Sequence, residues 1–504
     1  MNTLDSEKFG ANSFWHALFD ANSIAVIGAK DIPGTWGYDS MRSLMNSAGQ
    51  GKTRKVYPVN PGIAEVMGLP SRDSILDITV PVDLAVIIVP AKIVPGVLRQ
   101  CVEKKVKAGV IVSAGFGEVG DEEGAALEAE VKEIAARGDI HFVGPNCIGH
   151  SDMHTHLASA GMAGQIPAGP VAVLSQSGTL GASMMQILAV AGIGLSKFVS
   201  TGNETSIHLE DYIEYLAQDN DTGIITAYIE GLREGRRFYE LAKKTTSRKP
   251  IVVIKTGTTE HSAKAARSHT GALSGAEEVY SAAFKQAGVI RAEDEEELRD
   301  VVVALLYQPL PRGRNVGIIS IGGGFGVVTA EACEKEGLTI APLQPQTIEK
   351  MDAILPPRWS HANPVDLVGI RPMGDDDTIP ACLKLLLEDG NIDGVIAFLP
   401  PNISRLGPIE NINPQTMREM QVDNQKYLDR LAGELKKYNK PVYLVRRFAF
   451  QPDASESSYV PENRLPEYEH HRRAARVMRQ LAWYRQYLDA VGANRQVSFT
   501  GERE

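Results

Sequence analysis

His269 lies in a loop of small residues, 267–275 (RSHTGALSG), directly before a helical pattern over residues 276–287. Small neighbours leave an imidazole ring approachable, and its nitrogen is a competent nucleophile toward phosphorus. A lone histidine is nonetheless more often structural than catalytic. A carboxylate on the other ring nitrogen would orient the ring, and Glu230, which ends the apolar run GIITAYIE, is the candidate.

Two turns that join an apolar run to a helical pattern have the composition of phosphate sites. The first comprises Ser175, Gln176, Ser177, Gly178 and Thr179, and the second comprises Gly322, Gly323, Gly324 and Gly326. Hydroxyls and free amides at a helix start favour an anion. The first turn is not a GxSxG sequence, so a hydrolase nucleophile is disfavoured. A reactive histidine with two such turns would stabilise a phosphohistidine.

The first 160 residues carry further turns at predicted strand ends. Gly28, Ala29, Gly34 and Gly37 allow close approach of a phosphate, although an ordinary tight turn is the alternative. The second strand ends at Asn60 and Pro61 without the acid that a dinucleotide ribose needs, so NAD is disfavoured. Later strand ends add the remaining candidates for ligand binding: Pro90, Ala91, Lys92, Ser113, Ala114, Gly115 and Asn146.

Short, nearly all-apolar runs alternate with helical patterns along most of the chain. This alternation predicts parallel sheets covered by helices on both faces. The pattern restarts after Pro170 and again after Pro311. We therefore predict an α/β protein of three consecutive doubly wound (Rossmann or flavodoxin-like) domains and a helical tail: residues 1–160, 165–308, 311–455 and 456–504. The basic amphipathic helix over 472–488 is expected to pack on its own domain or on a partner.

Composition narrows the classes of protein that the chain can represent. The 504 residues carry a net charge of −10, which argues against general binding to nucleic acid or anionic membranes. Four cysteines without a CxxC pair predict neither a disulfide framework nor a zinc site. His150, His154 and His156 lack a partnering acid pattern, so we predict no metal. No targeting segment or apolar run of about 18 residues is found, and we expect a cytoplasmic protein.

These motifs together resemble the α subunits of the ADP-forming (NDP-forming) acyl-CoA synthetases, relatives of the succinyl-CoA synthetase α subunit. The resemblance covers nearly the whole chain. GAKDIPGTWG, VYPVNPG, VPAK, SAGFGE and GPNCIG resemble the CoA-binding domain. LSQSGTLG, TGNE, YIEG and SHTGALSG resemble the flavodoxin-like domain, and SIGGGFG with NPVDL resembles the ligase domain. Trp36 in GTWG departs from the small or aliphatic residue that relatives usually carry there, and it would either reshape the expected entrance to the CoA pocket or simply pack.

The resemblance implies roles for these residues. His269 would be the phosphohistidine, Glu230 its positioning carboxylate, and the two turns the sites that hold phosphate. The implied reaction interconverts acyl-CoA, ADP and phosphate with a carboxylic acid, CoA and ATP through an acyl phosphate. We find no ATP-grasp domain after residue 455, and about 45 residues are too few to hold one. The resemblance therefore implies a separate ATP-grasp β subunit that binds ADP or ATP with Mg²⁺, in an α2β2 assembly.

Three other functions are alternatives to the α subunit of an acyl-CoA synthetase. A non-catalytic CoA-binding regulatory protein would not need both His269 and Glu230. A nucleotide-independent acyl or carbamoyl transferase stays open because the nucleotide domain is missing. An NAD-dependent dehydrogenase is disfavoured by the strand end at Asn60. The sequence leaves the acyl group, the choice of ADP or GDP and the physiological direction undetermined.

Overall fold

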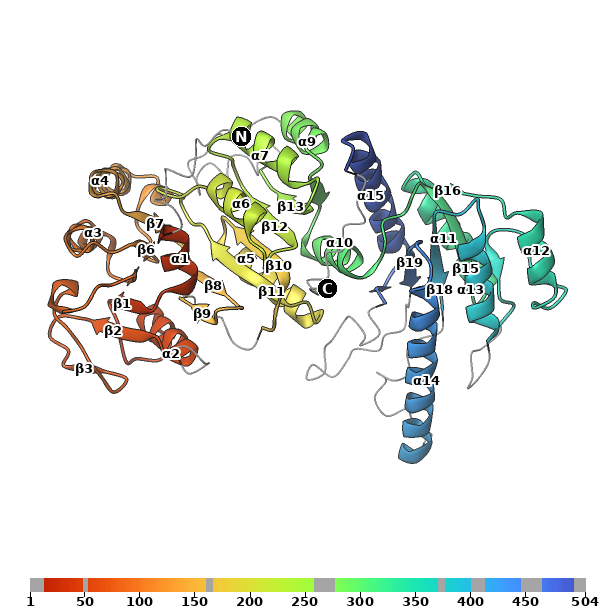
Figure 1. Ribbon diagram of the computed structural model, residues 1–504, viewed down its shortest axis with the longest axis horizontal. Helices are drawn as coiled ribbons and strands as arrows, with labels where there is room; N and C mark the ends of the chain where they lie inside the picture. Colours follow the sequence, from red (N-terminus) through yellow and green to blue (C-terminus); the bar gives the residue numbers. More distant parts are fainter. Residues whose placement is uncertain are drawn as a thin grey trace. The chain divides into compact units, whose positions relative to one another are not determined.

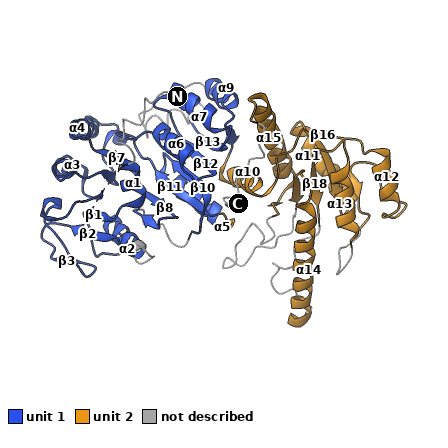
Figure 2. Ribbon diagram, viewed as in Figure 1, with its two compact units in different colours: residues 1–189, 194–293, 501–504 blue, residues 190–193, 294–500 orange. Residues whose placement is uncertain are grey.

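The computed structural model describes residues 13–48, 53–159, 166–257, 277–369, 377–399, 413–445 and 465–493. The chain divides into two compact units, shown in Figure 2. The first takes residues 1–189, 194–293 and 501–504, and the second takes residues 190–193 and 294–500. His269 and its loop lie outside the described residues. No described helix combines the length and apolar character needed to cross a membrane.

The first unit begins with a parallel sheet in the order β2-β1-β5-β6-β7 (Figure 1). Its central strands form because their short apolar runs are buried on both faces, as LAVI in β5 and AGVI in β6 are. The strands are β1 Ser23–Ile27, β2 Lys55–Val59, β5 Leu84–Ile87, β6 Ala108–Ile111 and β7 His141–Val143. The helices are α1 Ser13–Asp20, α2 Trp36–Ala48, α3 Val94–Glu103 and α4 Glu122–Gly138, and a small hairpin pairs β3 Glu65–Val66 with β4 Leu69–Pro70.

The second sheet of this unit has the order β14-β13-β12-β10-β11-β8-β9. The sheet is parallel from β14 to β11, and β8 and β9 join its edge antiparallel. Its strands are β8 His150–Asp152, β9 Leu157–Ala158, β10 Ala168–Ser175, β11 Leu195–Ser200, β12 Ile224–Ile229, β13 Ile251–Lys255 and β14 Ile290–Ala292. Its helices are α5 Gly178–Val190, α6 Leu209–Gln218, α7 Gly235–Thr245 and α9 Glu277–Gln286.

A shared core joins the two sheets of the first unit. Phe14 and Leu18 of α1 belong to the same buried cluster as Val110 of β6 and Leu174 of β10. Trp15 of α1 stacks on Tyr215 of α6, with ring centroids 4.5 Å apart. Because α1 contacts elements of both sheets, it fixes the loops of one sheet relative to those of the other.

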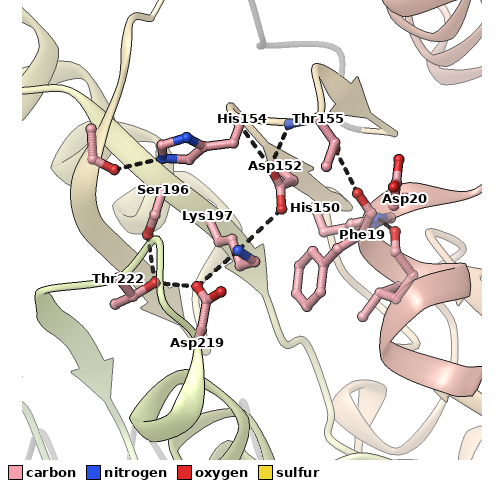
Figure 3. A network of polar contacts seen from close by, with 12 residues as sticks. Phe19, Asp20, His150, Asp152, His154, Thr155, Ser196, Lys197, Asp219 and Thr222 are labelled. Atoms are coloured by element: carbon pink, nitrogen blue, oxygen red, sulfur yellow. Dashed lines mark hydrogen bonds and ion pairs between the residues drawn. The ribbon is translucent and has the colours of Figure 1, made fainter. Parts of the chain in front are cut away.

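A buried ion-pair network of the second sheet lies against Phe19 of α1 (Figure 3). The Lys197 ammonium of β11 lies 3.1 Å from Asp152 of β8 and 2.8 Å from Asp219, which follows α6. Asp152 also accepts the backbone N–H groups of His154 and Thr155. Burial opposes the charge on Lys197, but the two carboxylates outweigh burial and raise its pKa.

The second unit contains a parallel sheet in the order β16-β15-β18-β19-β20, with β17 also pairing with β15. The strands are β15 Asn315–Ser320, β16 Thr339–Ile340, β17 Val365–Asp366, β18 Gly394–Phe398, β19 Val442–Val445 and β20 Glu467–Tyr468. The helices are α10 Glu295–Tyr307, α11 Gly323–Lys335, α12 Pro345–Asp352, α13 Thr378–Glu388, α14 Pro414–Leu435 and α15 His471–Ala490. The three sheets, which are parallel except at the edge formed by β8 and β9, confirm the predicted fold class.

The C-terminal helix α15 packs on its own unit. Val477 and Leu481 are buried on one face, and Gln480 donates a 2.7 Å hydrogen bond to Glu297 of α10. Arg473 donates to Asp300 of the same helix at 2.6 Å. The packing that the amphipathic pattern predicts is therefore observed, and the basic face of α15 pairs with acidic side chains.

Candidate active site

A cavity of about 850 Å³ lies in the first unit, where strands of both sheets end. The carboxyl ends of parallel strands are where α/β sheets bind ligands, at the point where strand order reverses. From the first sheet the lining takes Trp36, Ile88, Val89, Pro90, Val112, Ser113, Ala114, Asn146, Cys147 and Ile148. From the second sheet it takes Gln176, Ser177, Gly178, Thr179, Gly202, Asn203, Tyr228, Glu230, Thr256 and Gly257.

Glycines shape the turn after β1 on the first-sheet side. Gly28 has a φ of +93°, and a Cβ there would lie 2.1 Å from the Ile88 carbonyl oxygen. A Cβ on Gly37 would lie 2.4 Å from the Gly28 carbonyl oxygen, so α2 approaches β1 closely only without a side chain. Asn60 donates to the Ala29 carbonyl at 2.8 Å and ties the next turn to this one. These residues form the cavity's support, and Trp36 lies on its wall with 49% of its surface exposed.

The turn after β6 is stabilised by hydrogen bonds to the side chain of Glu118, which belongs to the same turn. The Ser113 hydroxyl donates to the Val89 carbonyl at 2.5 Å, and the Gly115 N–H donates to Glu118 at 2.6 Å. Burial works against ionisation of Glu118, but hydrogen bonds from Asn203 and from the Gly115 backbone outweigh it and lower its pKa. These contacts hold the backbone of the turn in place.

The turn after β10 opens helix α5 toward the cavity. The Ser175 hydroxyl donates to the Ser177 carbonyl at 2.6 Å, and Ser177 caps the helix by accepting the Leu180 N–H at 3.4 Å. The amides of Gly178 and Thr179 belong to the first turn, where an α-helix offers no internal acceptor. Both residues line the cavity. This end of the cavity therefore has the donors that a phosphate needs.

Gln176 holds the strand end that carries Glu230. Its side-chain oxygen accepts the N–H groups of Glu230 at 2.6 Å and Gly231 at 3.0 Å. Its side-chain nitrogen donates to the Gly231 carbonyl at 2.7 Å and to Glu204 at 3.0 Å. The sequence predicts that Gln176 binds phosphate, whereas these contacts direct its side chain to the protein backbone. Lys255 completes the support by donating to the Glu230 carbonyl at 2.9 Å.

Asn203 connects the two halves of the wall. Its side-chain nitrogen donates to Glu118 at 2.6 Å and to Glu128 at 3.0 Å, and its side-chain oxygen accepts from Asn146 at 3.2 Å. Its backbone carbonyl accepts from Arg233 at 2.8 Å. One residue of the second sheet thus positions two turns of the first sheet.

The remaining candidates lie away from the cavity lining. Lys92 is exposed and pairs with Glu123 at 2.6 Å. Ser175 supports the turn from behind, and the other predicted residues outside the lining are Gly28, Ala29, Gly34, Gly37, Asn60, Pro61, Ala91 and Gly115. The turn Gly322–Gly326 belongs to the second unit and opens α11 there. The Asp366 carboxylate lies 3.0 Å from where a Cβ of Gly323 would be, which puts a negative charge beside that helix start.

Several cavity residues are not among the binding residues predicted from the sequence, although Gly202, Asn203 and Tyr228 lie in the motifs TGNE and YIEG. Gly202 and Asn203 follow β11, a strand hidden because LSKFVS carries buried polar side chains at Ser196 and Lys197. Tyr228 and Thr256 lie on neighbouring strand ends, and the Thr256 hydroxyl donates to the Tyr228 hydroxyl at 2.9 Å. Period-two alternation from Glu230 back to Tyr228 was the available signal.

The histidines near residue 150 contact protein groups. The His150 ring nitrogens lie 2.5 Å from the Leu18 carbonyl and 2.8 Å from the Ser159 hydroxyl. Burial lowers the pKa of His150 to about 4. Within the described ranges, no group of three His, Cys, Asp or Glu side chains is arranged to hold a metal ion.

Three family models match consecutive parts of the chain. A CoA binding domain matches residues 22–152, a succinyl-CoA ligase like flavodoxin domain matches 168–305, and a ligase-CoA domain matches 316–403. The cavity lies between turns of the first two matched segments. Fold, site and matches define a CoA-binding protein of the succinyl-CoA ligase type.

The relatives narrow this class. The chain is 41% identical over 410 residues to the α subunit of an ADP-forming acetate–CoA ligase of Pyrococcus furiosus, covering 81% of this chain and 88% of that one. It is 43% identical to an ADP-forming acetate–CoA ligase of Methanocaldococcus jannaschii, but covers only 48% of it. The structure of a dinucleotide-forming acetyl-coenzyme A synthetase of Ca. Korarchaeum cryptofilum, in complex with phosphate and ADP, matches with a TM-score of 0.79 at 32% identity, over 96% of this chain and 100% of that one.

The chain therefore belongs to the α subunits of the ADP-forming acyl-CoA synthetases, a family of acid–thiol ligases.

Proposed function

We propose that this chain catalyses the reversible conversion of acyl-CoA, phosphate and ADP to a carboxylic acid, CoA and ATP, with a separate partner subunit. The observation that carries the proposal is the cavity itself. It is lined by the CoA-side turns at Pro90 and Ser113, by the helix start at Gly178 and by Glu230. A thioester, a phosphate and a positioning carboxylate are the groups that the reaction must bring together.

The proposed reaction has three transfers. A phosphate oxygen attacks the thioester carbon, the carbon–sulfur bond breaks, and CoA leaves as a thiolate that takes a proton from water. A ring nitrogen of His269 then attacks phosphorus, and the carboxylate leaves. Finally an ADP oxygen attacks the phosphohistidine, the phosphorus–nitrogen bond breaks, and ATP forms. Glu230 would orient the imidazole through its other ring nitrogen.

The donors around the cavity fit these substrates. The Gly178 and Thr179 amides would hold phosphate, and the second helix start, Gly322–Gly326, is proposed as a further phosphate site. The turns at Gly28, Gly34, Gly37, Asn60 and Pro61 and those at Pro90, Ala91, Lys92, Ser113, Ala114, Gly115 and Asn146 would bind CoA. Apolar walls at Ile88, Val112 and Ile148 suit an acyl chain.

A monocarboxylic acid is the proposed substrate class. Among the described lining residues, none is a lysine or arginine that would pair with a second carboxylate. Names of relatives include ligases for acetate and 4-hydroxybutyrate. We propose acetate as the first acid to test, an ATP-grasp β subunit that binds ADP with Mg²⁺, an α2β2 assembly and a cytoplasmic setting.

Labelling of the chain alone tests the proposal. Incubation with acetyl-CoA and radioactive phosphate should give acid-labile, base-stable label on the protein. His269→Ala should abolish the label while leaving CoA binding intact. Label that persists in His269→Ala would refute the phosphohistidine, and CoA binding without any label in the wild type would favour a binding protein.

A further inference from the structure

Glu204 is a buried carboxylate behind the active-site wall. It follows Asn203 in the segment after β11, with a φ of +57° and 3% of its surface exposed. One carboxylate oxygen accepts from the Gln176 amide at 3.0 Å and from the Thr201 hydroxyl at 2.8 Å. The other oxygen is buried and has no hydrogen-bond partner among the residues that the structure describes. An unsatisfied buried carboxylate costs stability, so its presence points to another role.

The Gln176 amide has two possible orientations, and only one supports Glu230. Its oxygen must face the N–H groups of Glu230 and Gly231, which are donors. Its nitrogen must then face acceptors, namely the Gly231 carbonyl and Glu204. A flipped amide would direct its oxygen at both acceptors. The Glu204 carboxylate therefore adds to the Gly231 backbone groups in selecting the orientation that holds the Glu230 backbone.

The Glu230 backbone is held from two sides. Gln176 accepts its N–H, and Lys255 donates to its carbonyl. The Lys255 ammonium is itself fixed 4.4 Å from the centre of the Tyr280 ring. Loss of the contact from Gln176 removes one of these two described supports, so the Glu230 carboxylate can shift within the cavity. A displacement of about 1 Å at a catalytic group can lower a rate by about 100-fold.

We propose that Glu204 is a positioning residue that fixes Glu230 through Gln176 for the phosphoryl transfer to His269. This inference rests on the proposed function, because Glu230 acts there on the histidine. Glu204 does not line the cavity, so it acts without touching substrate. Formation of acyl phosphate does not use Glu230 and should be independent of Glu204.

Two half-reactions separate these steps on the full chain. Arsenate in place of phosphate gives an acyl arsenate that hydrolyses in water, so CoA release reports the first step alone. Radioactive phosphate reports labelling of the histidine. Glu204→Ala should lower the labelling rate at least 10-fold, with arsenate-dependent CoA release within about 3-fold of wild type. Glu204→Gln keeps an acceptor for Gln176 and should restore most of the labelling rate.

Two controls test the route and the specificity of the effect. Glu230→Gln should lower the labelling rate to a small but measurable value, and adding Glu204→Ala to it should cause no further loss, because both act at one point. Glu297→Ala in the second unit removes a similar buried contact, from Gln480 to a glutamate, and should destabilise without changing the labelling rate. Unchanged labelling in Glu204→Ala, or an additive double variant, would overturn the proposal.

A crystal structure of Glu204→Ala tests the positioning without any chemistry. The 2.6 Å contact between the Gln176 oxygen and the Glu230 N–H should lengthen or be lost. If this contact persists, the positioning route through Gln176 is wrong. If wild-type chain gives no label at all, the phosphohistidine fails, and this structural comparison still decides whether Glu204 positions Glu230.

Discussion

Burial determines the chemistry of individual side chains around the cavity. Cys147 lines the cavity, yet burial raises the pKa of its thiol to about 12, so the thiol is not a nucleophile near neutral pH. Lys255 is shifted in the other sense, because burial and the neighbouring Arg291 lower its pKa to about 8. Glu204 is raised to a pKa of about 7 by burial and by Glu210. These groups differ from exposed residues of the same type, and only the structure identifies them.

The raised pKa of Glu204 makes stability depend on pH. Between its ordinary value of 4.5 and about 7, the folded chain holds a proton that the unfolded chain releases. Stability from this group is therefore fully present below 4.5 and is lost as pH rises through 7. The titratable groups that face Glu204 are Glu210 and Tyr212 on α6 and Arg233 after β12. A substitution at Glu204 alone leaves these three groups in place.

Glu204→Gln should remove this pH dependence. At pH 5 the variant and the wild type should unfold at similar temperatures. At pH 8 the variant should be more stable, by up to about 3 kcal/mol at about 1.4 kcal/mol per pKa unit. Calorimetry at a series of pH values measures the difference. A difference that is constant across pH would show that Glu204 is ionised at the same pH in the folded and unfolded chains.

At the scale of elements, α1 joins the two sheets of the first unit, and an ion-pair network between β8, β11 and the end of α6 lies against it. Their contacts combine the stack of Trp15 on Tyr215 with the ion pairs of Lys197. Both carboxylates of the network are also hydrogen-bonded, Asp219 by Thr222 and Asp152 by backbone N–H groups. Removing one partner of such a buried, hydrogen-bonded ion pair strongly lowers the free energy of unfolding.

Lys197→Met should destabilise the chain by about 3–5 kcal/mol, because Asp152 and Asp219 would remain buried without their cation. The thermal unfolding of the first unit should move to lower temperature. Lys244→Met, an exposed lysine of α7, is the matched control and should stay within about 0.5 kcal/mol of wild type. Equal stability of the two variants would mean that the network contributes nothing.

At the scale of the whole molecule, the chain matches most of one relative and about half of another. It spans 88% of the Pyrococcus furiosus α subunit and 48% of the Methanocaldococcus jannaschii protein. In the proposed function, the first two transfers use residues of this chain and the third needs nucleotide. The partner subunit would therefore supply the step that forms ATP.

Isolated chain labelled on His269 should keep its phosphate when ADP and Mg²⁺ are added. Addition of an ATP-grasp β subunit should move the label to ATP within the assay time. His269→Ala with the same partner should form no ATP. Label transfer to ADP by the isolated chain would contradict the need for a partner.

Much of the fold was predictable because its units are local. Apolar runs such as LAVI in β5 and GVIAF in β18 are buried along their whole length, which is the pattern of a covered parallel strand. The strand β11 was missed because Ser196 and Lys197 interrupt its apolar run, and they are stabilised only by partners distant in sequence. The domain limits remain predictions, and β8 and β9, inside the predicted first domain, pair with the second sheet.

The sequence by itself determined the strand–turn–helix units, the family and the candidate site residues, because these depend on neighbours along the chain. Only the tertiary structure decided which turns meet. It joined the turns at Ser113 and Asn146 to the start of α5 and to Glu230, and it directed Gln176 to the backbone. It also buried Glu204 beneath them. Strand order and burial control these contacts, and both arise from packing between residues that lie far apart in the sequence.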